Sequence, residues 1–297
     1  MIAAGGAGDA SLTGAAALST GRRAARAPPL RRPRGERLHF MVRTPMPEGP
    51  TIVILKEEAA SFAGRTVRQV TGNSSQDIQR MRGRKILAIR SWGKHFLLEF
   101  SDFSLRVHFM LYGSYRINER REAAPRLSLQ FDGGDELNFY ACSIKFIDQP
   151  LDEVYDWSAD VMSPDWDAKA ARKKLKQMPQ ALAADALLDQ NVFSGVGNII
   201  KNEALHRIRV HPESLIGALP SRKLSELIAQ ARDYSFDFYR WKKAYELKRH
   251  LQVHTKTHCP RDGERLSFRK HLGRFKRRAF FCPVCQRLYP ASGDGEA

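Results

Sequence analysis

The chain has 297 residues, of which 42% are hydrophobic and 27% are charged. This length allows two modest globular domains rather than one large core. Lysine and arginine number 49 against 32 acidic residues, so the formal net charge is +17. No apolar run approaches the length of a transmembrane span, and no basic amphipathic helix stands out, which disfavours a membrane partner. The charge favours a nucleic acid partner, since each phosphate contacted releases condensed counterions.

Residues 1–45 are rich in alanine, glycine, arginine and proline and have no hydrophobic periodicity. We therefore expect residues 1–46 to be disordered or a non-native extension. The arginines allow an organelle-targeting segment. The alternative is upstream sequence translated before a native start at Met46, which the chemistry of the next residues favours. We then expect a bacterial cytoplasmic protein associated with the nucleoid, and organelle targeting is the less favoured alternative.

From Met46 onward the hydrophobic pattern changes. Pro50 suits a first helical turn, apolar residues share one face, and Gly64 can end the helix. Short β-type segments follow at Lys85–Ile89, Phe96–Phe100, Leu105–Met110, Ser114–Ile117, Leu127–Phe131 and Leu137–Ala141. The sequence Asp-Gly-Gly-Asp makes a turn between the last two. Residues 47–164 are therefore predicted to form an antiparallel β-sandwich or barrel.

From about Asp165 the periodicity becomes helical. The pattern over Leu175–Leu188 is broken by Pro179, and a second helix is expected over Asn198–His206 after a glycine turn. Ser221 is predicted to cap a third helix. We assign residues 165–248 to a helical domain and residues 249–290 to a separate cysteine-containing finger.

The tail reads Cys259-Pro-Arg-Asp262, then nineteen residues, then Cys282-Pro-Val-Cys285. Two such pairs at this spacing are typical of a tetrahedral zinc ribbon, here with Asp262 in place of one cysteine. Three nearby histidines are alternatives for the fourth ligand: His254, His258 and His271. A degenerate finger without metal is the remaining alternative. The basic stretch Arg269–Arg278 between the pairs suits a DNA backbone or groove.

Two further motifs carry chemistry. Gly195 and Gly197 allow a tight turn before Asn198, where the backbone amides of the next helix can bind a phosphate.

The second motif is Met46-Pro47-Glu48-Gly49-Pro50. An initiator methionine before proline is commonly removed, which leaves a secondary amine on Pro47. An α-amino group titrates near pH ~7.7–8.0, so about a tenth of it is nucleophilic at neutral pH. Its attack on a sugar C1′ gives an iminium that promotes elimination. Either motif alone is an ordinary turn.

Together the motifs resemble the formamidopyrimidine-DNA glycosylase and endonuclease VIII family, over about residues 46–290. The matching elements, in order, are Pro47-Glu48, Arg90-Ser-Trp-Gly-Lys94, the glycine turn followed by Glu203, and the ribbon. The resemblance implies an α+β multidomain fold with an N-terminal β-sandwich, a helix–two-turn–helix domain and a C-terminal zinc β-hairpin. It also implies a monomer with one structural zinc ion that binds damaged double-stranded DNA between its halves.

The resemblance also assigns roles. Pro47 becomes the Schiff-base nucleophile, Glu48 the general acid that helps to open the sugar ring, and Lys94 a cation near the sugar or its 3′ phosphate. Asn198 and Arg277 become phosphate binders. Arg278, the next residue, is the alternative to Arg277 as a phosphate binder. Glu203 is interpreted as a structural residue that fixes the glycine turn.

The segment His108–Gly113 falls where the family fills the gap left by an extruded base. The residues concerned are Met110, Leu111 and Tyr112. A buried strand end would have the same sequence, so both interpretations stand.

The sequence departs from the family pattern at two positions that bear on function. The family commonly has an acid where this chain has Thr51, and Tyr140–Ile147 lacks the Asp-Pro-Arg-Arg-Phe-Gly loop of the purine branch. The sequence therefore favours a bifunctional glycosylase and AP lyase of the endonuclease VIII branch, which removes oxidised pyrimidines and cleaves the strand by β,δ-elimination. The alternatives are a glycosylase for oxidised purines, and a non-catalytic DNA-binding protein. The second applies if residues 1–46 stay attached, because Pro47 then has no free amine.

Overall fold

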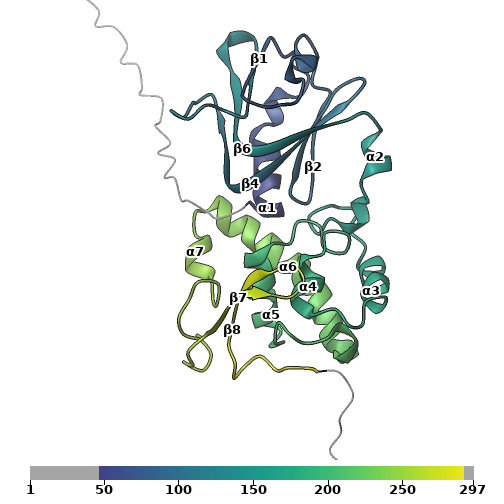
Figure 1. Ribbon diagram of the computed structural model, residues 1–297, viewed down its shortest axis with the longest axis vertical. Helices are drawn as coiled ribbons and strands as arrows, with labels where there is room; N and C mark the ends of the chain where they lie inside the picture. The colour runs from purple at the N-terminus through teal and green to yellow at the C-terminus, as the bar shows by residue number, and fades with distance from the viewer. Residues whose placement is uncertain (1–46, 291–297) are drawn as a thin grey trace, which may run out of the picture. The chain divides into compact units, whose positions relative to one another are not determined.

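The computed structural model describes residues 47–290, so the predictions for residues 1–46 lie outside the described residues (Figure 1). The helices are α1 Gly49–Glu58, α2 Leu151–Val154, α3 Ala168–Lys176, α4 Ala183–Leu188, α5 Asn198–Arg207, α6 Ser221–Lys243 and α7 Leu247–His250. The strands are β1 Gln69–Thr71, β2 Ala88–Trp92, β3 His95–Glu99, β4 Ser104–Ile117, β5 Leu127–Gln130, β6 Glu136–Ile147, β7 Ser267–Leu272 and β8 Arg277–Phe281. Every helix in this range is too short or too polar to span a bilayer.

Within the described residues, the N-terminal strands form one antiparallel sheet in the order β1-β5-β6-β4-β3-β2. An α+β fold with an antiparallel sheet is therefore confirmed, but two separate sheets do not form. The physical reason is the length of β4 and β6. The first part of β4 pairs with β3 and with the end of β6, whereas its last part pairs with the start of β6. Both strands thus belong to both halves of a bent sheet.

Helix α1 packs on this sheet through Ile52 and Leu55, which lie one helical turn apart. Ile52, Leu55 and Ala59 are fully buried in a core with side chains from the strands. Burial of each larger aliphatic side chain contributes about 1.5–3 kcal/mol. The helix also contacts α6, where the Tyr239 hydroxyl donates a 2.6 Å hydrogen bond to Glu57.

The helices from α3 to α6 surround a second core, which includes Phe193, Leu227 and Phe238. Pro179 lies between α3 and α4, as the sequence predicts. The predicted cap of α6 is wrong. Pro220 occupies the N-cap position, and Ser221 is the first helical residue.

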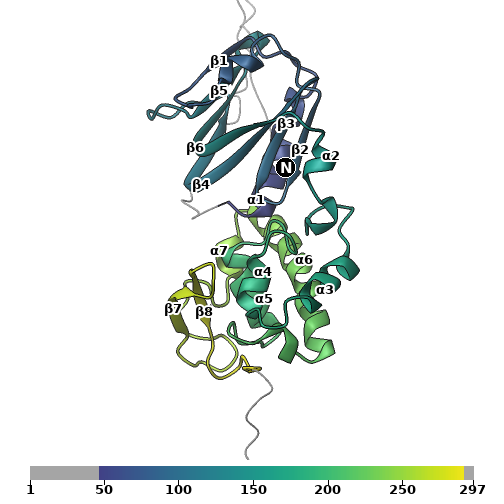
Figure 2. The same ribbon diagram turned by 45° about the vertical axis from the view of Figure 1, so that its right-hand side comes forward.

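The β7–β8 hairpin packs against α5, and the two lie side by side in Figure 2. Its buried residues Leu272, Ala279 and Phe281 join the core of the helices. The hairpin turn is attached to α4, because the Asp185 carboxylate accepts the Arg274 N–H at 2.9 Å. These contacts fix the basic strand β8 beside the start of α5.

Candidate active site

Two glycines let three distant segments meet. A Cβ atom on Gly93 would collide with Ser194, and a Cβ atom on Gly197 would collide with the carboxyl group of Glu48. A side chain at Gly93 would push the segment that carries Lys94 away from the turn before α5. A side chain at Gly197 would push Glu48 away from the same turn. The glycine turn that precedes α5 is thus required by close packing.

Glu48 lies beneath this turn and is 3% exposed. Its carboxylate accepts hydrogen bonds from the N–H groups of Gly197, Ile199 and Ile200 at 3.1, 2.7 and 3.2 Å. These three amides are therefore not free for the phosphate that the sequence predicts at this turn, because they already donate to the buried carboxylate. Phosphate binding by Asn198 itself stays a prediction.

Burial raises the pKa of Glu48 above its ordinary value of 4.5, whereas Lys94 and the three N–H groups lower it. The net shift is upward, since desolvation disfavours the charged form most strongly. At neutral pH Glu48 therefore holds a proton more readily than an exposed glutamate. A carboxyl group of this kind is suited to general acid catalysis.

Lys94 lies in the turn between β2 and β3 and is partly buried. Burial lowers the pKa of its ammonium group to about 8, with the Glu48 carboxylate opposing this shift and Arg277 adding to it. Lys94 therefore lies close enough to both side chains to interact with their charges. Pro47 directly precedes Glu48 and is partly exposed. The structure thus gathers the three predicted catalytic residues at one place.

The hairpin distinguishes Arg277 from Arg278. Alternate residues of a strand point to opposite faces. The charge of Arg277 acts on Lys94, whereas the charge of Arg278 acts on His254. Arg277 is therefore the one that faces the candidate site.

Asn198 is the first residue of α5, and its Oδ1 accepts a 2.8 Å hydrogen bond from Lys201. Sequence reasoning missed Lys201, which is fully buried. Burial lowers the pKa of Lys201 to about 7, opposed by Glu48 and Asp185. Its position one helical turn after Asn198 is the signal that could have identified it.

Met110, Leu111 and Tyr112 are 53%, 53% and 64% exposed. They form a bulge, because the pairing of β4 with β6 shifts register between Phe109 and Ser114. A buried strand end is therefore the wrong interpretation of this segment. Its insertion into DNA stays a prediction.

Glu203 is fully buried in α5. Its carboxylate accepts the N–H groups of Gln252, Val253 and His254 at 3.0, 3.0 and 2.7 Å. Its role is structural, as predicted, but it holds the first residues of the finger instead of the glycine turn.

In the finger, the ligand atoms of Cys259, Asp262, Cys282 and Cys285 all lie within 4.8 Å of one another. The Sγ atoms of Cys259 and Cys285 are 3.8 Å apart. A tetrahedral zinc ion with Zn–S bonds of about 2.3 Å would hold two sulfur atoms about 3.8 Å apart. The cluster therefore fits a metal ion of this size.

The histidine alternatives have other partners. His254 is paired with Asn202, His258 with Thr257 and His271 with the Lys276 carbonyl. His206 lies far from the cysteine pairs in the sequence, but its Nε2 atom is 3.5 Å from the Cys259 sulfur. It is placed to support that ligand from α5.

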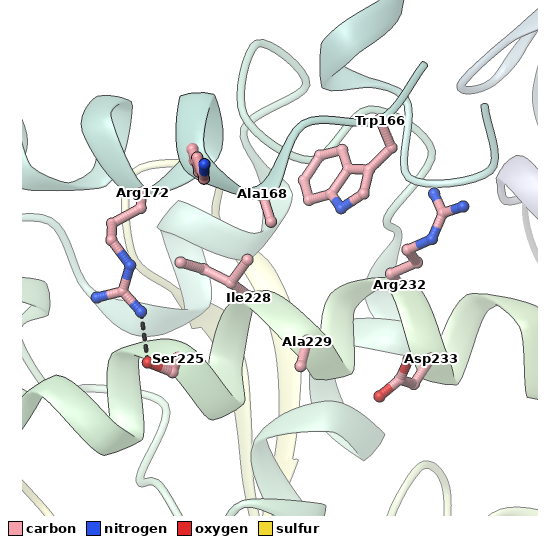
Figure 3. Close-up of a pocket in the computed structure, with 9 residues that line it drawn as sticks. Trp166, Ala168, Arg172, Ser225, Ile228, Ala229, Arg232 and Asp233 are labelled. Atoms are coloured by element: carbon pink, nitrogen blue, oxygen red, sulfur yellow. Dashed lines mark hydrogen bonds between the residues drawn. The ribbon is translucent and has the colours of Figure 1, made fainter. Parts of the chain in front are cut away.

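A cavity of about 430 Å³ lies between α3 and α6 (Figure 3). Trp166 and Ile228 contribute apolar surface, and Lys169, Arg172 and Arg232 are basic residues in its lining. None of the predicted site residues lines this cavity.

Comparison with known proteins matches two family models to this fold. Residues 46–142 match the formamidopyrimidine-DNA glycosylase N-terminal domain, and residues 158–234 match the H2TH domain of the same family. Together these matches cover more than half of the chain. The chain belongs to the formamidopyrimidine-DNA glycosylase and endonuclease VIII family.

Curated relatives include the endonuclease 8-like 3 protein of Mus musculus, which is 32% identical over 212 residues, or 68% of this chain and 34% of the relative. The endonuclease 8-like 2 protein of Mus musculus is 34% identical over 203 residues, or 64% of this chain and 60% of the relative. The chain thus spans about a third to three fifths of these relatives. Their names agree with the branch that the sequence predicts.

Solved structures support the fold. One is the Lactococcus lactis formamidopyrimidine DNA glycosylase, non-covalently bound to DNA with an AP site. It has a TM-score of 0.71 and 24% identity, and the match covers 81% of this chain and 99% of that chain. A viral DNA glycosylase has a TM-score of 0.70 and 20% identity, with 81% and 100% coverage.

Proposed function

We propose that the chain, when it begins at Pro47, is a bifunctional DNA glycosylase and AP lyase of base excision repair. The main support is the position of Glu48, a buried acid with a raised pKa directly after the residue that would carry the free amine. Two cations lie near Glu48: Lys94 interacts with the Glu48 carboxylate and also with the charge of Arg277. Such a group suits a substrate with a sugar, a leaving base and flanking phosphates.

In this mechanism the Pro47 nitrogen attacks C1′ of the damaged nucleotide, and the bond from C1′ to the base breaks. The base leaves with the proton that the Pro47 nitrogen loses after the attack, and Glu48 donates its own proton to the sugar ring oxygen as the C1′–O4′ bond opens. The resulting iminium accepts electrons when the C2′ proton is removed, and the 3′ phosphate then leaves. Loss of the C4′ proton and the 5′ phosphate completes the second elimination. Lys94 stabilises the developing negative charge.

We infer that oxidised pyrimidines are the preferred lesions. The stretch Tyr140–Ile147 belongs to β6, so it offers no loop of the kind that the purine branch places opposite the lesion. The relatives with endonuclease 8-like names support the same choice. Duplexes with thymine glycol and with 8-oxoguanine provide the test.

We expect the chain beginning at Pro47 to release thymine glycol at least about tenfold faster than 8-oxoguanine, a difference of about 1.4 kcal/mol in transition-state binding. Base release under single-turnover conditions measures this ratio without the strand-cleavage step. Equal rates, or faster release of 8-oxoguanine, would contradict the pyrimidine preference. An undamaged duplex is the control for nonspecific cleavage.

We also propose that Cys259, Asp262, Cys282 and Cys285 hold one structural zinc ion. When bound, it would supply folding free energy to a finger that buries little apolar surface. We expect one zinc per chain in the wild type and clearly less in Cys282→Ser and Asp262→Ala, as measured by metal analysis on purified protein.

Chelation should reduce DNA binding, since it loosens β8 and Arg277, while the N-terminal sheet stays folded. Circular dichroism and DNA affinity before and after chelation separate these effects. Full zinc content in Asp262→Ala would assign the fourth ligand to another residue, such as His206. A wild type without zinc would show that packing alone holds the finger.

A further inference from the structure

Lys201 is unusual because its side chain is fully buried yet serves two acceptors on different elements. Its Nζ donates to Asn198 Oδ1 at 2.8 Å within α5 and to the Arg278 carbonyl oxygen at 2.7 Å on β8. A buried ammonium group is costly unless such partners compensate for lost water. The side chain therefore links the start of α5 to the hairpin strand.

The first bond fixes the orientation of the Asn198 amide. A lysine ammonium has three donors and no acceptor, whereas an asparagine amide has an oxygen acceptor at one end and an NH₂ donor at the other. Since Nζ donates to Oδ1, the amide oxygen faces Lys201. The NH₂ group is turned away from Lys201 and stays available as a donor to an anion.

The second bond holds the backbone of β8 at Arg278, directly after Arg277. Because neighbouring strand residues point to opposite faces, fixing this carbonyl also fixes the direction of the Arg277 side chain. The Asp185 carboxylate holds the hairpin turn through the Arg274 N–H. The hairpin is thus attached to α5 through Arg278 and to α4 through Arg274.

We propose that Lys201 is a positioning residue for DNA: it turns the Asn198 amide toward a backbone phosphate and holds β8 so that Arg277 reaches the same region. This inference rests on the proposed function, because it takes DNA as the ligand of the site. Lys201 itself is buried beneath these groups and acts through them. The phosphate would accept from the Asn198 NH₂ group and from the Arg277 guanidinium.

A double-mutant cycle tests this role. The variants are Lys201→Met, Asn198→Ala and the double mutant, each beginning at Pro47, with a duplex that contains a preformed abasic site. Loss of a hydrogen bond to a charged group costs enough to raise KM about tenfold. We expect each single variant to raise KM by about this factor with kcat within about twofold of wild type. The double mutant should raise KM by less than the product of the single effects.

A matched control is Lys223→Met. Lys223 also donates to a backbone carbonyl, that of Ile208 at 2.6 Å, but its other acceptor is Glu226 within α6 and not a residue of α5 or β8. Its KM should equal that of wild type. Unchanged KM in Lys201→Met, or independent effects of Lys201→Met and Asn198→Ala, would overturn the proposal.

A second variant, Asn198→Asp, keeps Lys201 and so does not depend on how Lys201→Met folds. The carboxylate can still accept from Lys201, so thermal stability should match wild type. The group turned toward DNA loses its donor and becomes an anion, so KM should rise at least as far as in Asn198→Ala. Wild-type KM in Asn198→Asp would show that the amide NH₂ does not face DNA.

Binding to an uncleavable abasic-site analogue separates this proposal from the proposed function. If wild type binds the analogue but cleaves no abasic DNA, the proposed enzyme is wrong. Weakened binding by Lys201→Met and Asn198→Asp would then still support the positioning role. If wild type neither binds nor cleaves, both proposals are overturned. If wild type cleaves and both variants bind normally, the Lys201 proposal alone fails.

Discussion

Borohydride reduction should trap a covalent adduct between abasic-site DNA and the chain that begins at Pro47. The secondary amine forms an iminium, which borohydride reduces to a stable amine. The chain that retains residues 1–46 should give no adduct at Pro47, because the nitrogen is then part of a peptide bond. We expect the difference in trapped fraction to exceed about a thousandfold, since removal of a nucleophile abolishes most of the catalysis. Intact mass and peptide mapping locate the linkage.

The longer form is the matched control, because it carries the same Glu48 and Lys94. An adduct in the longer form that maps to Lys94 would assign the nucleophile to that lysine, whose pKa is lowered to about 8 by burial. Absence of any adduct with the Pro47 form, under conditions that trap another family member, would leave a DNA-binding protein without this chemistry. Each outcome selects one of the alternatives that the sequence left open.

Glu48→Gln should slow the release of a damaged base by about a hundredfold to ten-thousandfold, which is the contribution of a general acid. Cleavage at a preformed abasic site should fall less, since such a sugar already opens to its aldehyde without loss of a base. In wild type, the rate should fall at high pH, where Glu48 has lost its proton, and the raised pKa moves this loss to higher pH than for an exposed glutamate. It should also fall at low pH, where the Pro47 amine is protonated. Single-turnover rates across pH measure both limbs.

The amide of Glu48→Gln places an NH₂ group against backbone N–H donors, so part of its effect is structural, at about 1–3 kcal/mol of stability. Glu203→Gln is the matched control, because Glu203 also accepts three backbone N–H groups in a buried position. It should lose comparable thermal stability and keep base release near the wild-type rate. Equal losses of rate in both variants would contradict a role of Glu48 as an acid.

Local patterns predicted most elements, because helix and strand periodicity act over a few residues. The break at Pro179 and the start of α5 at Asn198 agree with the structure. The continuity of β4 through Met110–Gly113 was missed, because the bulge resembles a strand end in sequence. Strand β1 was also missed, since three residues are too few for a periodic signal.

The sequence by itself determined the residue types of the candidate site. Pro47-Glu48, Lys94, Asn198 and the cysteine spacing are chemical features, and their order along the chain carries the family resemblance. The zinc prediction also needed no fold, because the spacing of two short turns defines a tetrahedral site.

Tertiary structure decided how these residues are used. It directs the Glu48 carboxylate onto backbone amides about 150 positions later in the chain, where a phosphate was expected. It also makes Lys201 a link between α5 and β8, and it turns Arg277 instead of Arg278 toward Lys94. Burial and side-chain direction arise from contacts between distant segments, so no local period in the sequence specifies them.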